Sequence, residues 1–175
     1  FKDSLGLAAD IFMDAGTYYK YEPHYTGNGT VTFYTMVWAL NSFKEKEPIE
    51  YFRSHMKYNL LNFEQYKLLI EFFNQKQKEI NICSIDSIFK KELCNSIDIL
   101  KLLASINVGY NETIDLNFRI KCFKEVIENI EEIKKDLKDT WLYRNKYSRL
   151  DKSLEELNKV KQFAIMSIDY YQGGK

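Results

Sequence analysis

Glycine and proline are scarce in this sequence. Its 175 residues include seven glycines and two prolines, too few for a collagen-like or linker-like chain and few for a turn-rich all-β protein. No apolar stretch approaches the roughly 18 residues that indicate a transmembrane helix. The 25 basic residues balance the 25 acidic ones. Because a zero net charge provides no overall field toward nucleic acid or an anionic membrane, we expect neither partner.

Cysteine and histidine are also rare, which limits the chemistry available. Cys83, Cys94 and Cys122 form no Cys-x-x-Cys pair, and their odd number argues against a disulfide framework. We expect free thiols that are buried or half-buried. Neither His24 nor His55 has a partner at a zinc-ligand spacing, and neither follows a glutamate by three residues, as a di-iron helical bundle requires. The sequence predicts no metal site and no cofactor.

Apolar residues recur at intervals of three and four along nearly the whole chain, which is the spacing of amphipathic helices. The pattern predicts helices over about 4–20, 31–43 and 113–143, others between them, and a last helix from Leu150. A strand is the competing interpretation for residues 31–35, which favour strands in isolation. We expect an all-α fold, an antiparallel helical bundle of six or seven helices that ends in a long helical hairpin.

Capping and turn-forming residues predict where these helices begin and end. The predicted starts are Asn28 or Thr30, Pro48, Asn62 with Gln65 as a capping box, Ser84, and the segment 148–151. The predicted stops are Glu22-Pro23 and the turn at 108–111. Residues 1–171 form one predicted all-α domain, and 172–175 a frayed tail. Because the sequence begins with Phe1 rather than Met, we expect a fragment of a larger protein.

Aromatic residues make up 15% of the chain, and they crowd between residues 18 and 38. Two of them, Tyr18 and Tyr19, are adjacent, so one helix cannot bury both in the same stripe. A satisfied core with isolated exposed tyrosines would explain the crowding. A surface that docks another domain or stacks on sugar rings would explain it equally well. The candidate residues for docking or sugar stacking are Tyr18, Tyr19, Tyr21 and Trp38.

Residues 137–154 have the sequence LKDTWLYRNKYSRLDKSL, in which a Trp-Leu-x-Arg-Asn-Lys run and a turn precede a Leu-x-x-Ser-Leu helix. Upstream, DAGTYY occupies 14–19 and GNGT occupies 27–30. These patches resemble bacterial family 20 glycoside hydrolases, the β-N-acetylhexosaminidases. The first is similar to a pattern near their C-terminus and the second to the tract after their catalytic barrel. At the turn, the chain has Tyr147-Ser148-Arg149 where the family has Pro-Ser-Gly or Pro-Gly-Gly.

The resemblance implies that catalysis takes place in a domain other than this one. In that family a β/α barrel carries an adjacent Asp-Glu pair. The substrate's own acetamido oxygen attacks the anomeric carbon, the Asp orients it, and the Glu protonates the leaving oxygen. This sequence contains no Asp-Glu pair in either order, so the resemblance implies that no residue here is catalytic. The function it implies is a non-catalytic C-terminal domain that packs on or organises the barrel of the same polypeptide, or helps to build a homodimer.

Two other functions remain open from the residues alone. One is that the bundle is a free-standing helical module that binds a protein partner. The other is that its exposed Tyr and Trp rings bind carbohydrate. No sorting signal in the sequence indicates a compartment.

Overall fold

The computed structural model describes residues 7, 10–11, 14–22, 30–144 and 149–173. Its elements in that part are the 3₁₀-helix η1 (Gly16–Tyr21) and the α-helices α2 (Val31–Ser42), α3 (Pro48–Met56), α4 (Phe63–Ile82), α5 (Ser87–Gly109), α6 (Leu116–Arg144) and α7 (Leu150–Tyr171). The described residues contain no strand, so the all-α prediction is confirmed, and the stretch 31–35 is helical.

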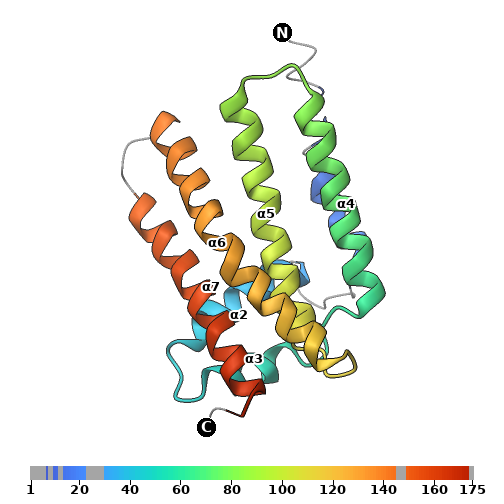
Figure 1. Ribbon diagram of the computed structural model, residues 1–175, viewed down its shortest axis with the longest axis vertical. Helices are drawn as coiled ribbons and strands as arrows, with labels where there is room; N and C mark the ends of the chain where they lie inside the picture. Colours follow the sequence, from blue (N-terminus) through green and yellow to red (C-terminus); the bar gives the residue numbers. More distant parts are fainter. Residues whose placement is uncertain (1–6, 8–9, 12–13, 23–29, 145–148, 174–175) are drawn as a thin grey trace.

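Helices α4 to α7 stand side by side as a row of long antiparallel helices (Figure 1). The two shorter helices, α2 and α3, lie behind the lower half of this row, where α2 contacts α5 and α7, and η1 lies against α4. At the end of the chain, α6 and α7 pack together as the predicted hairpin. None of the helices in the described part combines the length and the apolar composition that a membrane crossing requires.

Three predicted helix starts are confirmed by the residues found there. The Thr30 hydroxyl accepts a hydrogen bond from the Phe33 amide at 3.2 Å, and Pro48 is the first residue of α3. Asn62 and Gln65 form a complete capping box, with both bonds at 2.9 Å. The caps satisfy N–H groups that have no partner within the helix, which is why such residues indicate helix starts.

One predicted boundary was wrong, and one predicted helix changes its type along its length. The start of α5 is capped by Asp86, whose carboxylate accepts a hydrogen bond from the Ile88 amide at 2.8 Å, rather than by Ser84. The helix predicted over 4–20 is α-helical in its described residues only up to Ala15 and continues as η1, where the Thr17 hydroxyl donates to the Asp14 carbonyl at 2.7 Å. The alternative cap Asn28 and the predicted turn at 145–148 lie outside the described residues.

The C-terminal half of α5 is the centre of the molecule. Every residue from Leu102 to Gly109 is buried. Leu102 and Ile106 belong to a hydrophobic cluster with α2, α3, α6 and α7, whereas Ala104 and Val108 belong to a second cluster with α4 and η1. Helix α5 therefore separates two cores and contacts both.

Asn107 is the polar residue that joins this half of α5 to its neighbours. Its side chain is fully buried, and its carbonyl oxygen accepts a hydrogen bond from the Leu61 amide at 2.7 Å. Its amide group donates to Thr35 Oγ1 at 3.0 Å and to the Asn59 carbonyl at 3.1 Å. One amide side chain thus satisfies groups on α2 and on the α3–α4 connection that would otherwise be costly to bury.

Gly109 has a packing role in addition to its place in the turn that ends α5. The predicted turn at 108–111 is confirmed, since Gly109 is the last residue of α5, and the φ of Gly109 is not positive. A Cβ atom at this position would lie 2.6 Å from Cζ of the Phe123 ring. Phe123 is fully buried and packs against Tyr171 and Tyr110, so its ring has little room to move. Glycine is needed here for close packing of α5 on α6.

We expect Gly109→Ala to lower the free energy of unfolding by about 1–2 kcal/mol. Overpacking of a rigid core typically costs more than the roughly 1 kcal/mol that alanine gains over glycine inside a helix. Urea denaturation measures the change. The matched control is Gly16→Ala, because a Cβ atom at Gly16 would have no neighbour within 4 Å and the φ of Gly16 is not positive. A Gly109→Ala protein as stable as the parent would contradict this packing role.

Candidate functional site

Helix α2 contains no charged residue along its twelve positions, Val31–Ser42. Its inward side consists of Val31, Thr32, Thr35, Ala39 and Ser42, all fully buried. These side chains are small, so α2 can approach α5 closely. Two of their hydroxyl groups are satisfied locally, since Thr35 donates to the Val31 carbonyl at 2.9 Å and Ser42 to the Ala39 carbonyl at 2.7 Å.

Four apolar side chains of α2 are only partly buried or exposed. Phe33, Val37 and Leu40 are spaced by four and three residues, which places them on one helix face, and Met36 flanks them. Phe33 is 54% exposed, and the other three are partly exposed. We call these four residues the α2 face. A surface helix normally carries charged residues on its outward side. The α2 face carries none, although Leu40 of this face also packs against the core.

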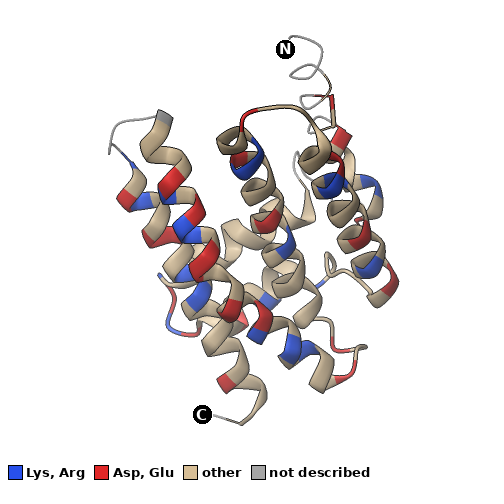
Figure 2. Cartoon of the chain, turned by 45° about the horizontal axis from the view of Figure 1, so that its top comes forward, with Lys and Arg blue, Asp and Glu red and all other residues tan. Residues whose placement is uncertain are grey.

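Charged residues follow α2 directly in the sequence. The connection that follows α2 carries Lys44, Glu45, Lys46 and Glu47, all exposed. Elsewhere, lysine and arginine are interspersed with aspartate and glutamate along the long helices, with no large region of one sign in the view shown (Figure 2). An apolar centre with a polar, mixed-charge rim is the usual anatomy of a protein–protein interface.

The segment Asp14–Glu22, which we call the strap, contains three of the four residues predicted to dock a domain or a sugar. Tyr18 and Tyr21 turn toward α4, with ring centroids 5.4 Å from Phe73 and 5.1 Å from Phe72. Tyr19 is 57% exposed. Two of these tyrosines therefore hold the strap on the bundle, and one remains available to a partner.

The strap is also held by an ion pair at its beginning. Lys76 of α4 is largely buried, and its ammonium group lies 2.6 Å from the Asp14 carboxylate and 2.9 Å from that of Glu79. Hydrogen bonding to Lys76 and its positive charge hold the pKa of the Asp14 carboxyl below its ordinary value. The same lysine lowers the pKa of Glu79.

Trp38, the fourth predicted residue, has its contacts on α3 rather than with the strap. The centroid of its ring lies 4.3 Å from that of His55 and 6.1 Å from that of Tyr51. The ring also packs against the core formed with α5, α6 and α7. The Trp38 indole thus lies between His55 and the core, and its contacts with His55 and Tyr51 join α2 to α3. The structure thus places the four predicted residues in two separate groups.

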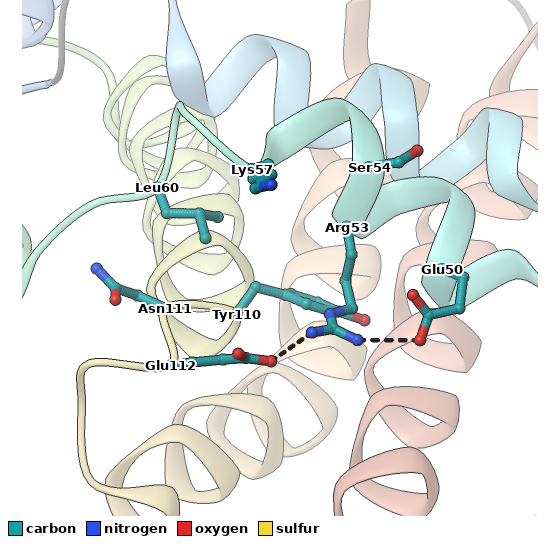
Figure 3. A pocket seen from close by; sticks show the side chains of 8 residues that line it. All are labelled: Glu50, Arg53, Ser54, Lys57, Leu60, Tyr110, Asn111 and Glu112. Carbon is teal, nitrogen blue, oxygen red and sulfur yellow. Dashed lines mark hydrogen bonds and ion pairs between the residues drawn. The ribbon is translucent and has the colours of Figure 1, made fainter.

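A pocket of about 420 Å³ opens between α3 and the α5–α6 connection (Figure 3). Arg53 extends across it and donates to Glu50 at 2.9 Å, to Glu112 and to the Tyr170 hydroxyl. Tyr170 in turn donates to Glu50 at 2.5 Å, and this bond, with Arg53, holds the pKa of Glu50 below its usual range. Two carboxylates balance the Arg53 charge. Since Tyr170 is on α7 and Glu112 is in the connection after α5, the network joins α3 to both.

The described residues contain no cluster of His, Cys, Asp or Glu that would hold a metal ion. The cysteines are free thiols, as predicted, with Cys83 and Cys122 buried and Cys94 half-buried. Burial raises the pKa of the Cys122 thiol to about 12 and also raises the pKa of Cys94. Both thiols are therefore protonated at neutral pH and are poor nucleophiles.

The sequence reasoning missed the residues of the α2 face. Phe33 belongs to the aromatic-rich stretch but is not among the four candidates, and apolar spacing alone gives Met36, Val37 and Leu40 no surface role. A signal was present, because the segment 31–42 has no charge and carries large apolar residues at a spacing of four and three. What the spacing could not reveal is that the small residues of α2 face the core.

Comparisons of the chain with protein-family models, with curated protein sequences and with solved structures find no match. The geometry described above and the sequence resemblance are therefore the basis for a functional proposal.

We expect acidification to release the strap before the bundle unfolds. Because the folded-state pKa values of Asp14 and Glu79 are lowered, their contribution to stability is complete at neutral pH. It is lost as the pH falls through those values, below about pH 4. The measurement is the chemical shift of the backbone amides of residues 17–21 by NMR between about pH 6 and pH 2.5.

The variant Lys76→Met should show the released strap spectrum already at neutral pH, whereas Asp10→Asn, at an exposed carboxylate, should behave as the parent. Strap signals that stay unchanged down to the lowest pH, while core signals also stay, would contradict the anchoring role of this ion pair.

Proposed function

We propose that this chain is a non-catalytic, C-terminal helical domain of a β-N-acetylhexosaminidase-like glycoside hydrolase and that its α2 face packs on the catalytic barrel of the same polypeptide. The α2 face is the observation that carries the docking role. A helix with no charge and with large apolar residues toward solvent is stabilised when a partner covers it. A β/α barrel has an outer ring of helices, whose side chains provide a surface of matching kind.

The burial energy favours such contact. Phe33 leaves more than half of its surface in water, and covering that part contributes on the order of 1 kcal/mol. Val37, Leu40 and Met36 add smaller amounts because each is already partly covered. Tyr19 on the strap is also exposed, and tyrosine is frequent among the residues that dominate interface energies.

The backbone at Arg149 supports the family assignment. Arg149 precedes α7 with φ of 71°, the only positive φ of a non-glycine residue in the described part of the chain. A side chain in this left-handed conformation costs roughly 1–2 kcal/mol, which glycine avoids. In the family that residues 137–154 resemble, the turn ends in glycine at this position. The left-handed backbone at Arg149 is therefore the conformation in which the glycine of the family pattern would be favourable.

We expect Arg149→Gly to raise the free energy of unfolding by about 0.5–1 kcal/mol, because relief of the left-handed strain exceeds the extra flexibility of glycine in the unfolded chain. Urea denaturation measures the change. Arg149→Ala is the matched control: it removes the same long side chain but keeps the Cβ atom, so no gain is expected. Equal stability of the two variants would mean that the strain at this position is negligible.

The family assignment is tested by the reading frame that contains the codon for Phe1. We expect it to encode, upstream, a β/α barrel with an Asp-Glu pair at a strand end. If the frame begins at Phe1 or encodes an unrelated domain upstream, the glycoside hydrolase assignment fails. The α2 face would then serve a free-standing module that binds a separate protein.

We expect Phe33→Asp and Val37→Asp to separate the helical domain from the barrel in the full-length enzyme, since each places an unpaired carboxylate in an apolar contact. Differential scanning calorimetry should show one coupled transition in the parent and two in the variants. Ile82→Asp is the matched control, because Ile82 is also apolar and is 83% exposed but lies at the end of α4. A single coupled transition in all four proteins would exclude docking through α2.

A further inference from the structure

We infer that Glu22 is the positioning residue of the α2 face: from the strap, its carboxylate holds the first turn of α2 in the helical form that presents Phe33 to a partner. The identity of that partner rests on the proposed docking function, whereas the clamp is a property of this chain.

The Glu22 side chain makes three hydrogen bonds to the start of α2. Its Oε2 accepts from the Val31 amide at 2.6 Å, and its Oε1 accepts from the Thr32 amide at 3.1 Å and from the Thr32 hydroxyl at 2.7 Å. The next amide, that of Phe33, donates to the Thr30 hydroxyl. The first N–H groups of a helix have no partner within it. Here Glu22 and Thr30 together satisfy those of the first three residues.

The carboxylate is drawn into the protein to make these bonds. Glu22 is half-buried, and burial raises its pKa, opposed by the hydrogen bonds from Thr32 and Val31. Its described partners are the amides and the hydroxyl of α2. A negative charge at a helix N-terminus is also favoured by the helix dipole. A glutamate side chain in water makes no such set of hydrogen bonds to one helix turn. The burial of Glu22 together with its three bonds therefore indicates a specific clamp on the start of α2.

Phe33 depends on this clamp because of its place in the helix. It is the third residue of α2, within the turn that Glu22 and Thr30 hold. The strap is tied to the same turn by the Tyr18 hydroxyl, 2.7 Å from Thr30 Oγ1. If the strap moves, Val31 and Thr32 lose their acceptors, the turn unwinds, and Phe33 leaves the α2 face. By linkage, a partner that covers Phe33 also stabilises the strap on the bundle.

Hydrogen exchange of the chain tests the clamp directly. We expect Glu22→Ala to speed the exchange of the Phe33 and Tyr34 amides about tenfold, since a charged hydrogen-bond network is lost from the turn. These two amides donate to Thr30, not to Glu22, so they report the turn itself. Glu22→Gln keeps one acceptor oxygen and should restore part of the protection. Exchange at the parent's rate in Glu22→Ala would overturn the clamp.

The matched control is Glu47→Ala. Glu47 also precedes a helix, α3, but its side chain makes no capping bond. Its removal should leave the exchange of both helix starts unchanged. If Glu47→Ala speeds exchange at Phe33 as much as Glu22→Ala does, the effect is a general charge effect and the clamp is overturned.

Calorimetry of the full-length enzyme separates this inference from the proposed function. If Glu22→Ala and Phe33→Asp both uncouple the domains and Glu22→Gln partly restores coupling, Glu22 positions the docking face. If Phe33→Asp uncouples them and Glu22→Ala does not, docking through α2 stands and the positioning role is overturned. If the exchange result holds but no α2 variant affects coupling, the clamp stands and the docking function fails.

Discussion

The rest of the structure depends on the complete burial of the C-terminal half of α5. From Leu102 to Gly109 this helix contacts one core on each side, so every neighbour must fit it closely. Gly109 admits the Phe123 ring of α6, and Asn107 provides the hydrogen bonds that the nearby backbone and Thr35 require. A buried helix segment without such a glycine and such an amide would leave either a steric clash or unsatisfied polar groups.

The unusual character of α2 follows from this constraint. To lie against α5, α2 places Thr35 and Ala39 inward, and Phe33, on another side of the helix, keeps more than half of its surface in water. Packing of the bundle thus creates the α2 face, and the absence of charge keeps it suitable for contact with another protein surface. The strap completes the arrangement, because Glu22 and Tyr18 hold the helix start from which Phe33 projects. Core packing, helix capping and the proposed docking surface are therefore parts of one local structure.

Two networks of charged side chains join elements at the edges of the molecule. Lys76 fastens the strap to α4, and Arg53 fastens α3 to α7. In both cases one cation is shared by two carboxylates, and the pKa values of Asp14 and Glu50 are lowered by these contacts. Pairs at such partly exposed positions stabilise modestly. Their main effect here is to fix positions, since each network holds a short element against the row of long helices.

The sequence alone determined the helical class, because apolar spacing and capping residues such as Thr30 and Asn62 act within one or two helical turns. It also determined that the aromatic-rich stretch 18–38 carries more rings than one stripe can bury. Only the tertiary structure decided which rings remain exposed: Tyr18, Tyr21 and Trp38 found partners on α4 and α3, whereas Tyr19 and Phe33 keep more than half of their surface in water. The roles of Gly109 and Glu22 likewise depend on atoms that are distant in sequence. The orientation of a helix about its axis is set by what it packs against, and local spacing does not contain that information.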